Sequence, residues 1–411
     1  MRLEIVALML SFGTSSLFWL LAAFRMETTV YGTMMQWQAL LMVSAAFFAW
    51  RTHDLVFHLQ KHHETTLRQA YFTAVKLEIA LTGAGTVCAV LLLQAAPWFG
   101  IAEASSDALA IGLVSLLANL TVLQGSATAY LRTLHLDRRI AHVDLITGAC
   151  WAVAVGLLWV LPADMPMAVL TTGLAAASVR ALALAWFALS AARVQHDPLD
   201  RAPPALDLRS LGKFLLAGQL TNFVKNNLLP IETLLLGRLA GADAVALFRL
   251  ARSLLNLTTV MLNISYQKSF VLLVKAADES ARLKAIRRMT RTSVLLWAGS
   301  FPIVFLAAYI FVALRHDDAY DQLLVVLALA AVATLPMALQ QSVFAALSLD
   351  GDFRRINIAY VIGLLALAGT CVVLRHAMTV NLFMMCIATS GFVRWFMMSS
   401  SFSWIPRRKQ P

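Results

Sequence analysis

The sequence predicts an all-α integral membrane protein with about twelve transmembrane helices. Three observations predict it. The 411 residues are 60% hydrophobic and 13% charged, with a mean hydropathy of +0.74, which is too apolar for a soluble globule. Apolar stretches of about 20 residues, the length that spans a bilayer as a helix, recur along the whole chain. Basic residues are concentrated in alternate loops, as in multi-pass membrane proteins.

Each expected span is a largely apolar run that ends near charged, proline or glycine residues. In chain order, the expected spans are Leu3 to Phe24, Tyr31 to Trp50, Tyr71 to Trp98, Ala108 to Leu131, Ile140 to Leu161, Met165 to Ala192, Leu211 to Leu236, Val245 to Val274, Thr292 to Leu314, Leu323 to Leu347, Ile356 to Leu374 and Val380 to Phe402. The first span resembles a signal peptide, but only Arg2 precedes it, so we expect it to be retained.

The distribution of positive charge predicts the orientation. Most of the 33 lysines and arginines lie at the termini and in the even-numbered loops, whereas the odd-numbered loops contain Arg25, Arg238, Arg315 and Arg375. By the positive-inside rule, both termini are expected in the cytoplasm. The net charge of +11 is thereby explained without a nucleic-acid partner. The four cysteines fall within spans at unrelated spacings, so neither a disulfide framework nor a metal site is expected.

A polar linker divides the spans six and six. It contains Pro203 and Pro204, and the expected organisation is an N-terminal lobe (1–195), a cytoplasmic linker (196–210) and a C-terminal lobe (211–411). Two halves of equal span number are typical of transporters that rock one bundle against the other. The connections between spans are too short to fold into a catalytic domain, so an enzyme is not expected.

Two cytoplasmic segments outside the spans have an amphipathic pattern. These are the basic run from Lys275 to Arg291 and the segment from Arg51 to Ala70, which we expect to lie on the membrane surface. In the second segment, His58 and His62 have the i, i+4 spacing of metal ligands. With no third ligand in sight, interfacial histidines are the favoured interpretation.

The eighth span contains an unbroken polar row. Its members follow one another at steps of three or four residues and therefore share one helix face: Arg249, Arg252, Asn256, Thr259, Asn263 and Gln267. The row is roughly 27 Å long at ~1.5 Å per residue, about the depth of the hydrocarbon core. We expect it to line a hydrated cavity. The alternative is that the arginines reach the interface and the amides join helices by hydrogen bonds.

Other polar residues at membrane depth add to this set. In the seventh span, Asn222 and Asn226 share a face, Lys225 lies beside them as the leading candidate for meeting an anion, and Pro230 follows as a helix-bending residue. Arg25 ends the first span.

Glu78, Asp144 and Glu232 are the carboxylates inside spans and the candidates for coupling to H+ or Na+. Ion pairing is the open alternative for them, including a pair between Arg180 and Asp144.

The junction from Ile231 to Arg252 resembles the polysaccharide and lipid-linked oligosaccharide (O-antigen type) flippases of the multidrug/oligosaccharidyl-lipid/polysaccharide exporter superfamily. That family carries an acidic residue, Leu-Gly, a short turn and Val-Gly-x-Tyr at this point. Here Glu232 takes the acidic position and Leu236-Gly237 is present, whereas Ala246 and Phe248 replace the glycine and tyrosine. The first junction, from Arg25 to Gly32, resembles the family's Arg, turn and Phe-Gly but is one residue short.

The resemblance implies two six-helix lobes around a central, V-shaped and cation-lined cavity. The implied cargo is a polyprenyl-pyrophosphate-linked oligosaccharide, flipped across a bacterial inner membrane for polysaccharide biosynthesis (O-antigen, capsule or exopolysaccharide). Membrane lipid, a glycan polymerase and export machinery are the implied partners, and no cofactor is expected. Two alternatives stay open: a cation-coupled multidrug exporter of the same superfamily, and a membrane-embedded glycan polymerase or glycosyltransferase.

Overall fold

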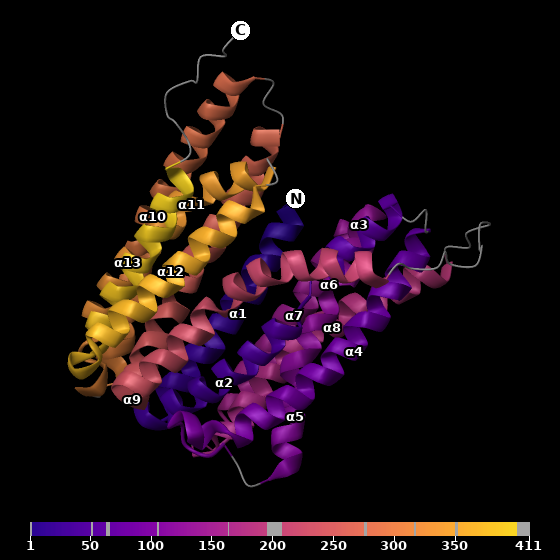
Figure 1. Cartoon of the computed structure of the whole chain (residues 1–411). Coiled ribbons are helices and arrows are strands. Elements are labelled where there is room, and N and C mark those ends of the chain that lie inside the picture. Colours follow the sequence, from indigo (N-terminus) through magenta and orange to yellow (C-terminus); the bar gives the residue numbers. More distant parts are fainter. Residues whose placement is uncertain are drawn as a thin grey trace. The chain divides into compact units, whose positions relative to one another are not determined.

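The computed structural model describes residues 2–50, 52–62, 66–104, 107–162, 164–194, 208–274, 278–315, 318–349 and 352–400. Within these ranges, the side chains of residues 2–5, 53, 58, 60–62, 122, 208–218, 220–222, 224–226, 257, 263–272, 274, 319 and 353 are not described. Every regular element in the described ranges is a helix (Figure 1).

The chain forms two compact units, Met1–Ala246 and Leu247–Pro411. The first unit contains α1 (Arg2–Arg25), α2 (Thr28–Phe48), α3 (Thr52–His62), α4 (Leu67–Gln94), the short 3-10 helix η1 (Ala96–Phe99), α5 (Ala108–Leu120), η2 (Thr121–Leu123), α6 (Gln124–Thr133), α7 (Asp137–Leu158), α8 (Pro166–Val194) and the first part of α9 (Leu208–Val274). In this unit α1 packs on α7, and α2 packs on α4 and α5. An edge-to-face aromatic cluster of Phe18, Trp19 and Trp151 fixes the α1–α7 contact.

The second unit starts within α9 and continues with α10 (Glu279–Arg315), η3 (Asp318–Tyr320), α11 (Leu323–Leu349), α12 (Phe353–Val373), η4 (Arg375–Ala377) and α13 (Val380–Ser399). Helix α11 contacts both α10 and α13, and α12 packs on α13. Half or more of the apolar membrane-length windows in α11 and α13 is buried, against 22% in α10, so α11 and α13 form the interior of this unit.

The fold class expected from the sequence is confirmed. Among the described residues, nine helices are long and apolar enough to cross a membrane. The expected second, seventh and eighth spans also lie in helices, namely α2 and the two parts of α9. Helix α2 contains two polar residues at membrane depth, Gln36 and Gln38, and both are buried by the surrounding protein.

The first part of α9 packs with α2 in the first unit. The ring of Phe223 meets Phe47 edge to face at 5.6 Å, and Gln219 donates a hydrogen bond to the carbonyl oxygen of Phe47 at 2.7 Å. Along the sequence, the boundary between the two compact units falls after residue 246, whereas the sequence suggested a division at 196–210. Residues 196–207 of that expected linker lie outside the described residues, and the division into lobes 1–195 and 211–411 stays a prediction.

Of the two amphipathic segments, one forms a separate helix and the other does not. Helix α3 buries Leu55, Val56 and Leu59 against α4 and α6, while the side chains of His58 and His62 are outside the described residues. The expectation of a surface helix at Lys275 to Arg291 was wrong in its boundary. From Glu279 onward this segment is the start of α10, which continues without a break into the ninth span. No proline or glycine interrupts the join, and Ile286 and Met289 are buried beside Ala345 and Ala346 of α11.

Two glycines shape the junction between the expected seventh and eighth spans. Gly241 has φ 85° and ψ 179°, a conformation that favours glycine, and is the non-helical point inside α9. Gly32 of α2 faces the next residue, Ala242, so closely that a Cβ on Gly32 would overlap its carbonyl group. Helix α2 and the turn of α9 can therefore meet only because residue 32 has no side chain.

Gly32→Ala is expected to destabilise the protein by about 1–3 kcal/mol, because the added methyl group must displace backbone. The measurement is the thermal unfolding transition of the full chain in detergent. Gly83→Ala in α4 is the matched control, since a Cβ there meets nothing within 4 Å and gains only helix propensity. Equal transitions for the two variants would contradict a close α2–α9 contact.

Candidate functional site

The expected fourth span is a broken helix. Helix α5 ends at Leu120, the 3-10 turn η2 covers Thr121–Leu123, and α6 begins at Gln124. A break inside a span leaves backbone N–H groups at the start of the new helix without helical partners, and these groups must be satisfied by protein because lipid cannot do so. Discontinuous helices in transporters often mark binding sites or hinges.

A buried carboxylate from α4 accepts a hydrogen bond from a backbone N–H group at the start of α6. Glu78 is 1% exposed and accepts a hydrogen bond from the backbone N–H of Ser126 at 2.8 Å. It also accepts from the hydroxyl groups of Ser126, at 2.6 Å, and Thr52, at 2.5 Å. Because α6 begins at Gln124, the negative charge lies at the positive end of that helix, where the helix dipole stabilises it. Glu78 thereby ties α3 and α4 to α6.

A second charged group contacts the same turn from another helix. Arg180 of α8 donates through Nε to Asp144 of α7 at 2.8 Å and through Nη1 to Gln124 at 2.6 Å. Asp144 is 6% exposed. The ion pair, one of the alternatives open at the sequence level, is thus present.

We call the group of Thr52, Glu78, Gln124, Ser126, Asp144 and Arg180 the α6 junction. All three charged side chains there, Glu78, Asp144 and Arg180, have specific partners, as charges at membrane depth must. Glu78 of α4 and Arg180 of α8 contact the first turn of α6 from separate helices. Glu78 and Arg180 therefore each hold a residue of α6 next to the break in the fourth span.

Sequence reasoning found the charged members of the α6 junction but missed Thr52, Gln124 and Ser126. The signal available for the last two is that Gln124-Gly125-Ser126 interrupts an otherwise apolar run. No comparable signal exists for Thr52, since it lies in a different amphipathic segment and meets Glu78 only through the packing of α3 on α4.

Arg25 and Glu232 lie elsewhere in the first unit. The Arg25 guanidinium donates to the carbonyl oxygen of Leu161 at 3.1 Å and lies 5.8 Å from the ring centroid of Trp159. It therefore fastens the end of α1 to the segment after α7. Glu232 is 2% exposed within α9.

The polar row of the eighth span is partly visible in the second unit. Arg249, Arg252 and Asn256 are half-buried, whereas the intervening Leu250, Ala251, Leu254 and Leu255 are buried. The Arg252 guanidinium lies 5.8 Å from the centroid of Phe248, whose ring packs against Phe383 of α13. The aromatic pair gives that cation a fixed support.

Several predicted site residues cannot be placed. The side chains of Asn222, Lys225, Asn226, Asn263 and Gln267 lie outside the described residues, although α9 contains all five. The assignment of these residues to a substrate site stays a prediction. Next to them, Asn227 is fully buried and donates to the carbonyl oxygen of Phe223 at 2.9 Å, which sequence reasoning did not single out.

The fold and these buried charges define the class: a multi-pass, all-helical membrane protein with a span interrupted by a 3-10 turn and an internal ion pair. The chain is similar in structure to a multidrug resistance MATE family transporter of the MOP superfamily, solved in an inward-facing conformation. The TM-score is 0.63 at 14% sequence identity, and the match covers 96% of this chain and 93% of the other. The protein therefore has the fold of that transporter. No protein-family model and no curated protein matches the sequence.

Proposed function

We propose that this protein is an alternating-access transporter that flips a polyprenyl-pyrophosphate-linked oligosaccharide across a bacterial inner membrane. The observation that supports it most is the row of half-buried Arg249, Arg252 and Asn256 on α9. A pyrophosphate with attached sugars cannot cross hydrocarbon unless protein groups replace its water. Guanidinium groups bind phosphate through paired hydrogen bonds, and amides suit sugar hydroxyls.

Within this proposal, Arg252 is the principal phosphate contact because Phe248 supports its guanidinium. Arg25 contributes as well, since its bond to Leu161 leaves other N–H donors of the guanidinium for a ligand. Lys225, Asn222, Asn226, Asn263 and Gln267 complete the proposed cargo site. A site richer in cations than in carboxylates favours an anionic headgroup over a cationic drug.

The conformational change is proposed to use the two interruptions in the helices, η2 in the fourth span and Gly241 in α9. Coupling to H+ or Na+ is assigned to Glu78, Asp144 or Glu232. Both termini are proposed to lie in the cytoplasm, and the flipped glycan would pass to a polymerase and export machinery.

A flipping assay tests the function. The full chain is reconstituted into liposomes with a polyprenyl-pyrophosphate oligosaccharide that carries a fluorescent sugar, and a membrane-impermeant quencher reports which leaflet holds it. Wild-type protein should exchange the lipid between leaflets. Arg252→Ala and Lys225→Ala should lower the rate about tenfold or more, since each removes a charged hydrogen-bond donor.

Arg288→Ala is the matched control, because Arg288 is an exposed cation of α10 in the same unit as Arg252. It should flip at the wild-type rate. Size-exclusion chromatography verifies that each variant is folded. Wild-type rates in both Arg252→Ala and Lys225→Ala would contradict the proposed cargo site.

The second candidate function is cation-coupled multidrug export, which the structural similarity to a multidrug resistance transporter favours. Liposomes loaded with ethidium distinguish the two functions. Export of ethidium together with no movement of the glycolipid would replace the proposed function with this one.

A further inference from the structure

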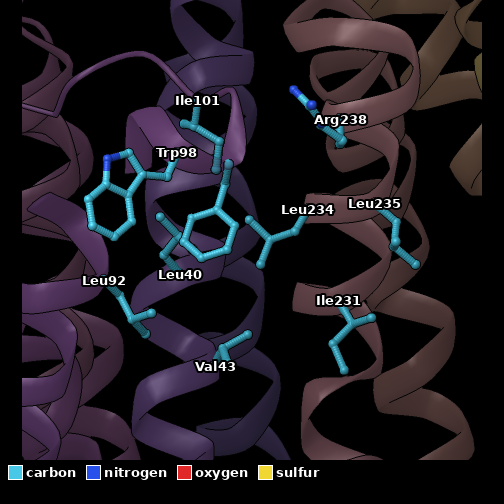
Figure 2. A pocket seen from close by; sticks show the side chains of 10 residues that line it. Leu40, Val43, Leu92, Trp98, Ile101, Ile231, Leu234, Leu235 and Arg238 are labelled. Carbon is cyan, nitrogen blue, oxygen red and sulfur yellow. The ribbon is translucent and has the colours of Figure 1, made fainter. Parts of the chain in front are cut away.

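An apolar groove in the first unit is unused by the proposed cargo site. It has a volume of about 430 Å³ and lies between α2, α4 and η1 on one side and the first part of α9 on the other (Figure 2). Leu40, Val43 and Leu92 line one wall, and Ile231, Leu234 and Leu235 line the facing wall. Such a surface suits a hydrocarbon chain and offers nothing to a sugar.

A cation, Arg238, lies at one end of this apolar groove. Arg238 is its one charged lining residue, and Figure 2 shows the side chain above the leucines, on the same helix as Leu234 and Leu235. It is exposed, and among the described residues it has no hydrogen-bond or ion-pair partner. A Cβ on Gly100 would lie 2.5 Å from its Nη1, so the guanidinium rests against the turn that follows η1.

Aromatic residues indicate the depth of this end of the groove. Trp98 and Phe99 of η1 line it, and Trp98 is 88% exposed. Exposed tryptophans of membrane proteins concentrate at the headgroup level. Arg238, in contact with the turn after Phe99, therefore lies where lipid phosphates lie.

We propose that the groove binds one acyl chain of an anionic phospholipid, with the lipid phosphate at Arg238. The walls match the hydrocarbon chain, and the unpaired guanidinium matches the phosphate. A zwitterionic headgroup would bring its own cation to a site that has no described carboxylate to receive it. This lipid site is separate from the polar row of α9, and the inference does not depend on the proposed cargo.

Native mass spectrometry tests the site. The full chain is purified in detergent with an equimolar mixture of phosphatidylglycerol and phosphatidylcholine of identical chains, and the bound lipids are counted. Wild-type protein should retain phosphatidylglycerol over phosphatidylcholine by about fivefold, the effect of one arginine near a headgroup. Arg238→Gln should remove this preference, and Leu234→Trp, which fills the groove, should reduce the retention of both lipids.

Arg375→Gln is the matched control, because Arg375 is also an exposed arginine in an odd-numbered loop but lines no part of this groove. It should retain the wild-type preference. Since Arg238 is exposed, its variant should fold even if Leu234→Trp does not. An unchanged preference in Arg238→Gln would overturn the proposal. Displacement of phosphatidylglycerol by a substoichiometric polyprenyl phosphate would also overturn it, because the groove would then belong to the cargo tail.

Discussion

Glu78→Ala is expected to lower the free energy of unfolding by about 3 kcal/mol or more. The substitution leaves the N–H of Ser126 and the hydroxyls of Ser126 and Thr52 without their acceptor. An unsatisfied buried donor costs about 1–3 kcal/mol, and the backbone N–H cannot turn toward another partner. The effect is measured as the shift of the denaturant unfolding transition in detergent micelles.

Glu78→Gln separates the shape of this side chain from its charge. The amide oxygen can accept from Ser126 N–H and Thr52, and the amide nitrogen can donate to the Ser126 hydroxyl, which can act as an acceptor. The loss should therefore be about 1 kcal/mol or less. Glu103→Ala, at an exposed carboxylate, should change stability by less than about 0.5 kcal/mol. A Glu78→Ala transition equal to that of Glu103→Ala would contradict the capping of α6.

Glu78→Gln also tests the assignment of ion coupling to Glu78. Glu78→Gln removes the titratable group while keeping the hydrogen bonds. If Glu78 carries the coupled ion, the flipping rate should no longer respond to an imposed ion gradient in a protein of nearly normal stability. A retained response would restrict Glu78 to its role at the start of α6.

Asp144→Ala is the second large change, with an expected loss of about 2–3 kcal/mol. It removes the carboxylate from Arg180, which keeps its hydrogen bond to Gln124. Breaking a buried ion pair costs about 3–5 kcal/mol, and the Arg180 side chain is 31% exposed, so water recovers part of that cost. The unfolding transition in detergent again provides the measurement.

A double variant distinguishes an unpaired charge from a packing defect. In Asp144→Leu with Arg180→Leu both charges are absent, and stability should return to within about 1 kcal/mol of the wild type. Asp144→Asn keeps an oxygen for Nε of Arg180 and should lose about 1 kcal/mol. A double variant as unstable as Asp144→Ala would show that the ion pair is not the source of the loss.

The sequence predicted the helices better than their ends or interruptions. Hydrophobic runs determine spans because a bilayer requires about 20 apolar residues, and the helices α7, α8 and α12 follow the expected ranges within a few residues. The break at η2 was not predicted, because the polar Gln124-Gly125-Ser126 that follows Thr121–Leu123 was not recognised as the start of a new helix. The sequence also failed to predict that the basic segment is continuous with α10. A change from charged to apolar residues indicates where a helix enters the membrane, but it does not end the helix.

What the sequence determined by itself is the class of protein, because the free energy of transferring each span into lipid depends on the composition of that span alone. It also identified the charges that lipid cannot accommodate, among them Glu78, Asp144 and Arg180. Only the tertiary structure decided their partners. The contacts of Glu78 with Thr52 and Ser126, and of Arg180 with Asp144 and Gln124, join residues separated by 26 to 56 positions. Which donor meets which acceptor across such distances is determined by helix packing, and no local pattern encodes it.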